Sequence, residues 1–115
     1  MTRHTVTYGA DFLATAQATY PDSRSTRYSG PTFHEFMALP VRSARFAFAN
    51  NWDALPSTMS GAARLVILEP SGVFGPIVFY AVLVARPTGL IVEIADFEED
   101  RAYWDTFVDP DDPDD

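Results

Sequence analysis

Hydrophobic positions change from helical spacing in the first half of the chain to strand spacing in the second half. A weak alternation over residues 2–8 places Val6 and Tyr8 on one side and predicts a short strand. A helix is predicted over 11–20, because its apolar residues recur at helical intervals: Phe12, Leu13, Ala16 and Tyr20. Pro21 should stop this helix, and 23–31 is expected to be a polar loop.

The middle of the chain carries helix signals, but part of it is ambiguous. Thr32 and Glu35 have the spacing of a capping box, in which each side chain bonds the backbone N–H of the other residue. Pro40 suits the first turn of a further helix, where its missing N–H costs nothing. Residues 41–53 fit helical spacing, yet the alternation of Ala44, Phe46 and Phe48 also fits a strand. Both interpretations stay open.

The second half predicts three strands, over 63–68, 73–86 and 90–97. Its long apolar run, Ile77 to Ala85, reads as a central strand that is buried on both faces. Turn residues at 69–72 and 87–89 separate the strands, so the three should pair as an antiparallel meander.

The C-terminal region should contain a short helix and then a tail. Glu98, Glu99 and Asp100 would open the helix, since acidic residues suit the positive end of the helix dipole. The tail 109–115, DPDDPDD, is acidic and broken by proline, so it is expected to be disordered. The predicted fold is therefore α+β: one domain over 1–108, with an N-terminal strand, helical segments, the meander and a C-terminal helix.

Charge narrows the classes of partner. The 115 residues include 16 acidic and 8 basic residues, for a net charge of −8, and every basic residue is Arg. This balance disfavours direct contact with a nucleic-acid backbone and suits a basic protein partner. The longest apolar run is too short to span a membrane, for which about 20 residues are needed, and Met1 to Tyr8 lacks a signal-peptide core. These features predict a cytoplasmic protein.

Most catalytic and metal-binding patterns are missing from the sequence. There is no Cys, which excludes disulfides and thiolate metal sites, and only His4 and His34 could supply imidazole. The acidic tail lacks the Gly and Glu of a calcium loop, and no Gly-x-Ser-x-Gly motif occurs. No catalytic residue, metal or cofactor is assigned, and a non-catalytic role is favoured over an enzyme. Arginines could still bind an anion if folding brought them together: Arg42, Arg45, Arg86 and Arg101.

An acidic segment with adjacent aromatic residues is the candidate binding surface, because aromatic side chains beside charge are common at interfaces. The alternative is an ordinary solvated surface. The candidate residues are Glu93, Asp96, Glu98, Glu99, Asp100, Tyr103 and Trp104. We expect them to engage a basic protein, as an inhibitor or a nucleic-acid mimic, and the many aromatic residues leave room for a homodimer.

The order of predicted elements, a strand, helices and then a meander, resembles that of the RelE/ParE toxin superfamily. The sequence Glu35-Phe36-Met37-Ala38-Leu39-Pro40 looks like the start of that family's helical segment, and Arg101-Ala102-Tyr103 looks like its C-terminus. The resemblance covers residues 32–104 and implies, as the alternative function, a toxin or a degenerate relative of a toxin–antitoxin system. The residues to examine would be Arg42, Arg45, Arg86, Arg101 and Tyr103.

The chain departs from that family in charge. Members that cleave mRNA on the ribosome are basic, whereas the corresponding stretch here reads Asp96-Phe97-Glu98-Glu99-Asp100. Residues 9–31 also look like an insertion. RNase activity is therefore not implied, since a shared fold does not fix function.

Overall fold

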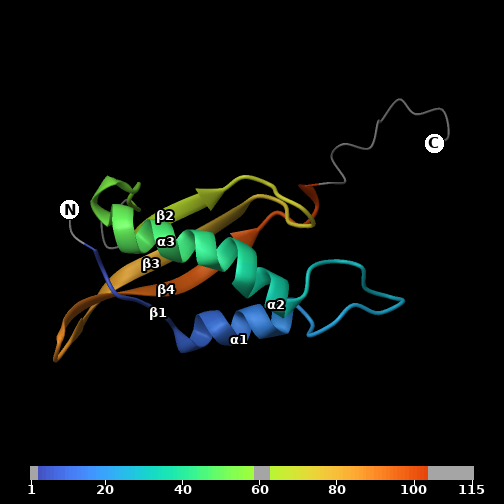
Figure 1. The fold of residues 1–115 in the computed structure, drawn as a ribbon, viewed down its shortest axis with the longest axis horizontal. Helices are drawn as coiled ribbons and strands as arrows, with labels where there is room; N and C mark the ends of the chain where they lie inside the picture. The colour runs from blue at the N-terminus through green and yellow to red at the C-terminus, as the bar shows by residue number, and fades with distance from the viewer. Residues whose placement is uncertain (1–2, 59–62, 104–115) are drawn as a thin grey trace.

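A four-stranded mixed sheet forms the centre of the molecule (Figure 1). The computed structural model describes residues 3–58 and 63–103. The strands are β1 (Val6–Tyr8), β2 (Ala63–Leu68), β3 (Ile77–Arg86) and β4 (Gly89–Glu99), in the spatial order β1-β4-β3-β2. Strands β2, β3 and β4 form the expected antiparallel meander, and β1 joins β4 in parallel. The α+β prediction is confirmed, with β1 making the sheet mixed.

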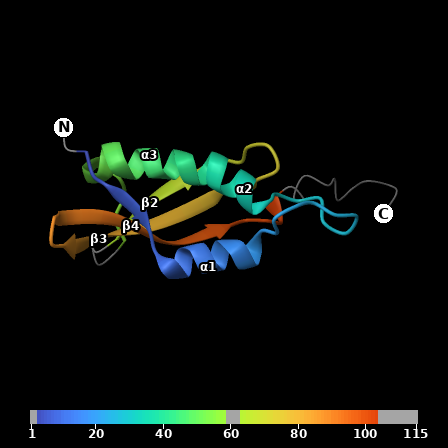
Figure 2. The same ribbon diagram turned by 60° about the horizontal axis from the view of Figure 1, so that its bottom comes forward.

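Helices pack on one side of the sheet. They are α1 (Ala10–Thr19), α2 (Phe33–Phe36) and α3 (Arg42–Asn51), with a π-helical turn at Met37–Val41 and a 3₁₀ turn at Trp52–Ala54. Figure 2 shows α2 and α3 as one continuous helical segment that runs along the sheet. Among the described residues, no helix has the length and apolar character needed to cross a membrane.

The long helical segment begins at the predicted capping box, but Pro40 does not begin a further helix as predicted. Thr32 Oγ1 accepts the Glu35 N–H at 3.3 Å and the Glu35 carboxylate accepts the Thr32 N–H at 3.0 Å, so the capping box is confirmed. Pro40 lies inside the π-helical turn and begins no new helix. Proline cannot make the usual α-helical hydrogen bond, and the wider π turn accommodates it without breaking the helix.

Burial of two phenylalanines decides between helix and strand for residues 41–53. Phe48 is fully buried, whereas the Phe46 side chain is 66% exposed. A strand would place these two on the same face, because its side chains repeat every second residue. The helical interpretation is therefore confirmed over Arg42–Asn51.

An aromatic cluster fills the core between α1, α2 and the sheet. Phe36 stacks on Tyr20 with ring centroids 4.5 Å apart and contacts Phe97 at 4.7 Å. Phe12 and Phe79 pack around the same group. Side chains from α1, α2, β3 and β4 thus meet in one core, which fixes the helices against the sheet.

Two predictions for the second half are wrong. Strand β3 begins at Ile77, and only one of its faces is buried, at Ile77, Phe79 and Ala81, because no helix of the described residues covers the other face. Glu98 and Glu99 extend β4 and pair with β3, where a helix was expected to start, and a turn follows at Asp100–Tyr103. The rest of the predicted C-terminal helix and the tail 109–115 lie outside the described residues.

Candidate functional site

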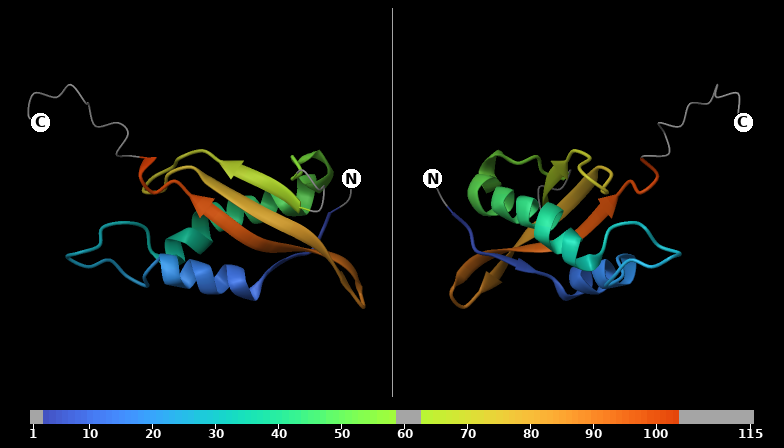
Figure 3. Two further views of the ribbon diagram at one scale, coloured as in Figure 1. Left: turned by 180° about the vertical axis from the view of Figure 1, so that it is seen from behind. Right: turned by 45° about the vertical axis from the view of Figure 1, so that its right-hand side comes forward.

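No helix of the described residues covers the side of the sheet opposite the helices, and this side carries three of the predicted binding residues, Glu93, Asp96 and Glu98. Figure 3 (left) shows β2, β3 and β4 in front of α3. Cross-strand partners share a face of a sheet, so the register identifies the side chains on this side. We call it the open face; its apolar members are Leu65, Ile67, Val78, Val82, Val84 and Ile91.

The apolar part of the open face is continuous from β2 to β3. Ile67 pairs with Val78, and Leu65 pairs with Tyr80. The Ile67 side chain is 63% exposed, while Val78 and Tyr80 are half-buried among their neighbours. Sequence reasoning missed these residues, because it assigned the apolar run of β3 to a strand covered on both faces. Burial of the second face depends on which helices pack there, and the local sequence does not carry that information.

A β-bulge at Ala95 determines which acidic residues share this face. Tyr80 pairs with Asp96, but its neighbour Ala81 pairs with Ile94, so Ala95 is the extra residue. Without the bulge, strict alternation from Glu93 would direct Asp96 and Glu98 into the core. With it, Glu93, Asp96 and Glu98 form what we call the acidic row along β4.

Tyr80 stands where the apolar part meets the acidic row. Partial burial raises the pKa of its hydroxyl, and the nearby Glu98 and Asp96 carboxylates raise the pKa further, because they disfavour another negative charge. The Tyr80 hydroxyl therefore stays protonated and can donate a hydrogen bond at neutral pH. At the other end of the row, the Glu93 carboxylate lies 3.5 Å from the Arg86 guanidinium.

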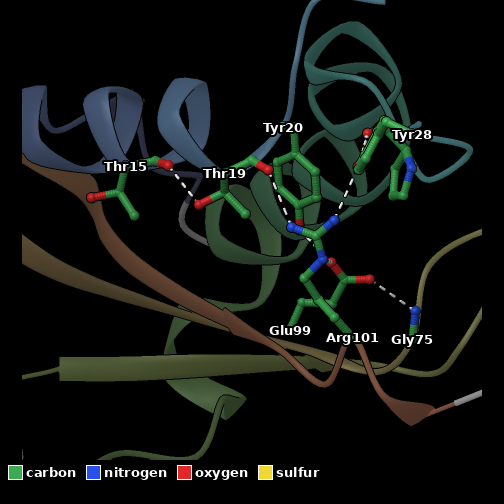
Figure 4. A network of polar contacts seen from close by, with 8 residues as sticks. Thr15, Thr19, Tyr20, Tyr28, Gly75, Glu99 and Arg101 are labelled. Atoms are coloured by element: carbon green, nitrogen blue, oxygen red, sulfur yellow. Dashed lines mark hydrogen bonds and ion pairs between the residues drawn. The ribbon is translucent and has the colours of Figure 1, made fainter. Parts of the chain in front are cut away.

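Glu99 faces the opposite way from the acidic row. Its side chain is only 3% exposed, and it accepts hydrogen bonds from the Tyr20 hydroxyl at 2.5 Å and the Gly75 N–H at 3.0 Å (Figure 4). Burial raises the pKa of Tyr20 strongly, and the bond to Glu99 adds to the shift. The Glu99 carboxylate thus connects the end of β4 to α1 and to the loop before β3, and it is not available to a partner.

The remaining predicted residues lie beside this network. Asp100 is exposed in the turn after β4, where its N–H donates to the Pro76 carbonyl. Tyr103 is half-buried against Gly75, and a Cβ at Gly75 would lie 2.1 Å from the Asp100 carbonyl oxygen. Trp104 lies outside the described residues. The structure therefore groups Glu93, Asp96 and Glu98 on one face and separates Glu99 from them.

The four arginines named as anion candidates do not form one cluster. Arg101 donates to the Thr19 carbonyl at 3.1 Å and to the Tyr28 hydroxyl at 3.0 Å, and its guanidinium lies over the Tyr20 ring (Figure 4). Arg86 contacts the acidic row, while Arg42 and Arg45 lie on α3 on the other side of the sheet. Arg86 and Arg101 therefore serve contacts within the protein.

Within the described residues, no three His, Asp or Glu side chains come together as a metal ion would require. Comparisons with protein-family models, with curated proteins and with solved structures each found no match to this chain.

Proposed function

We propose that this protein is a non-catalytic binding module whose open face engages a basic protein partner. The observation that carries the proposal is the acidic row, Glu93, Asp96 and Glu98, beside apolar side chains of β2 and β3 that no helix of the described residues covers. Apolar area contributes affinity when it is covered, and the charges select a partner of opposite sign.

Charge complementarity is the argument for a basic partner. The chain has a net charge of −8, and Asp96 and Glu98 are exposed without an ion pair in the described part of the chain. Two such carboxylates beside Ile67, Val78 and Tyr80 suit a partner segment that alternates basic and apolar side chains. A partner with an acidic or neutral segment would leave these carboxylates desolvated and unpaired, which is unfavourable.

A synthetic peptide of alternating Lys and Leu, with a Ser/Leu peptide as its neutral control, is a direct probe of this face. We expect the Lys/Leu peptide to shift the backbone NMR signals of β2, β3 and β4, and its affinity to fall as NaCl increases. Weaker binding is expected for the triple variant Glu93→Gln, Asp96→Asn, Glu98→Gln, by about tenfold or more.

A matched control variant removes the same number of negative charges at positions that are not on the open face. The variant Asp22→Asn, Asp53→Asn, Glu69→Gln removes three exposed carboxylates elsewhere. If both triple variants weaken binding equally, the attraction is one of overall charge and the open face is not the site. An affinity that does not change with salt would also contradict the proposal.

The second candidate function is a RelE/ParE-like toxin or a degenerate relative. The order of elements, a strand, helices and a three-stranded meander, favours it. The internal bonds of Arg101 count against an RNase site that uses this residue. Expression of the chain in bacteria tests this candidate: arrested growth with cleaved mRNA or inhibited gyrase would support it, and normal growth would count against it.

A further inference from the structure

A cavity of about 340 Å³ lies between β1 and α3, away from the open face. The residues just before β1, together with its first residue, form one wall, and one face of α3 forms the other. The lining residues are Arg3, His4, Thr5, Val6, Arg45 and Ala49. Two arginines and a histidine are therefore among the residues that line one cavity, and among the described residues no Asp or Glu lines it, in a protein with a net charge of −8.

Backbone pairing holds the two walls together. The Thr5 carbonyl accepts the Val92 N–H at 2.8 Å, which fixes the start of β1 on the sheet. The His4 N–H donates to the Ala49 carbonyl at 2.8 Å, and the His4 ring packs edge-on against Trp52. These contacts place Arg3 beside α3, so the cavity is built by the fold and does not depend on a chance meeting of surface side chains.

The arginines of this cavity have unused donors. Arg24, Arg86 and Arg101 each pair with a glutamate. In contrast, Arg3 and Arg45 make no hydrogen bond or ion pair with any described residue. The Arg45 guanidinium rests over the Tyr8 ring, 5.7 Å from its centroid. Stacking of this kind orients the guanidinium and leaves its N–H groups free in its plane.

We propose that this cavity binds the phosphate group of a small molecule. A phosphate monoester carries close to two negative charges at neutral pH, which match the guanidinium groups of Arg3 and Arg45. Each guanidinium can donate two parallel hydrogen bonds to phosphate oxygens. The partial negative charge at the C-terminal end of α3 opposes an anion, but it is weaker than the two full positive charges.

The size of the cavity limits the ligand. About 340 Å³ is near the lower end of the range for small-molecule sites, roughly 300–1,000 Å³. There is room for a phosphate and a short polar group. The exposed position of both arginines keeps the site open to solvent, which suits reversible binding of a soluble compound. This inference is independent of the proposed function, since it uses residues on the other side of the sheet.

Titration with inorganic phosphate and with glycerol 3-phosphate, followed by NMR and calorimetry at constant ionic strength, tests the site. We expect both anions to shift the signals of residues 3–8 and of α3, whereas acetate and chloride do not. Tighter binding of glycerol 3-phosphate would indicate a phosphate ester as the natural ligand, and equal binding would indicate free phosphate. Either result supports a phosphate site.

Variants of the two arginines sharpen the test. Arg45→Gln and Arg3→Gln should each weaken phosphate binding by about tenfold, and Arg45→Lys should weaken it less, because the charge remains and the paired donors are lost. The matched control is Arg27→Gln, an exposed arginine in the loop before α2. All of these positions are exposed, so the variants should fold.

Three results would overturn the proposal. The first is an equal loss of affinity in Arg27→Gln, which would mean that overall charge is responsible. The second is phosphate binding no stronger than chloride binding at the same ionic strength. The third is much tighter binding of a short single-stranded oligonucleotide than of glycerol 3-phosphate in the same cavity, which would replace the small molecule with a nucleic acid.

Discussion

Neighbouring residues of one type have opposite environments in this protein. Glu98 is exposed on the open face, whereas the Glu99 carboxylate is enclosed between Tyr20 and Gly75. Strand geometry explains the difference, since successive side chains point to opposite faces of a sheet. One carboxylate is available to a partner, and the other stabilises the fold.

Replacement of Glu99 should therefore destabilise the protein, and replacement of Glu98 should not. Glu99→Ala leaves the Tyr20 hydroxyl and the Gly75 N–H without their acceptor, which should lower the free energy of unfolding by about 2–3 kcal/mol. Glu98→Ala, the matched control, should change it by no more than about 0.5 kcal/mol. Urea denaturation of both variants measures the difference, and equal stabilities would contradict the buried network.

Glu35 gives the protein a specific response to acid. The hydrogen bond from Arg24, and then the Thr32 N–H, hold the pKa of Glu35 below its usual value of 4.5. A carboxyl group with a lowered pKa in the folded state stabilises the fold above its unfolded pKa, and this contribution is lost as the pH falls through the folded value.

The variant Glu35→Gln should lose this dependence, because glutamine does not titrate and can keep the capping box. Its free energy of unfolding should change less between about pH 6 and about pH 3 than that of the natural protein. Arg24→Gln should also weaken the pH dependence of the free energy of unfolding, though by less, since it removes the strongest partner of Glu35. Denaturation at several pH values tests this, and parallel curves for all three proteins would refute it.

At the scale of elements, α3 is helical because of the core that it contacts. Val41, Ala44 and Phe48 are fully buried along one side of the helical segment, while Phe46 points to solvent. The local sequence is compatible with a strand as well, but a strand would expose part of this apolar set. Tertiary packing resolves the ambiguity, as it often does for weak propensities.

Truncation of the two phenylalanines measures this packing. Phe48→Ala should lower the free energy of unfolding by about 3–5 kcal/mol, because it leaves a cavity in the core. Phe46→Ala should alter stability by less than about 0.5 kcal/mol. Thermal or chemical denaturation compares the two. Similar costs at both positions would mean that the helix is rotated from the position described.

At the scale of the whole molecule, the fold separates three kinds of surface. Helices and the aromatic core occupy one side of the sheet, and the acidic row lies on the open side. The arginine cavity opens between β1 and α3. A net charge of −8 is therefore unevenly distributed, and local sites of both signs coexist.

The acidic residues repel one another, which destabilises the folded protein. Because salt weakens this repulsion, the protein should be more stable at higher salt. Screening weakens this repulsion, because the Debye length falls from about 10 Å at 0.1 M to about 3 Å at 1 M. We expect Tm to rise by a few degrees between about 20 and about 500 mM NaCl, and to rise less when the acidic row is neutralised. Thermal denaturation followed by circular dichroism at neutral pH measures Tm at each salt concentration. A falling Tm would show that the Arg–Glu pairs dominate the response to salt.

The sequence alone determined the local features of this protein. Periodicity and turn residues predict the helix near 11–20, the capping box at Thr32 and the three-stranded meander, because each depends on interactions among residues close in the chain. The composition likewise predicts the acidic character of the surface.

Only the tertiary structure decided which side chains act together. The bulge at Ala95 reverses the alternation of β4, so Glu93, Asp96 and Glu98 share a face and Glu99 turns inward. The parallel pairing of β1 with β4 brings Arg3 to Arg45 across 42 positions of sequence. The first outcome depends on the exact register between β3 and β4, and the second on pairing between strands far apart in the sequence. The local pattern of residues specifies neither.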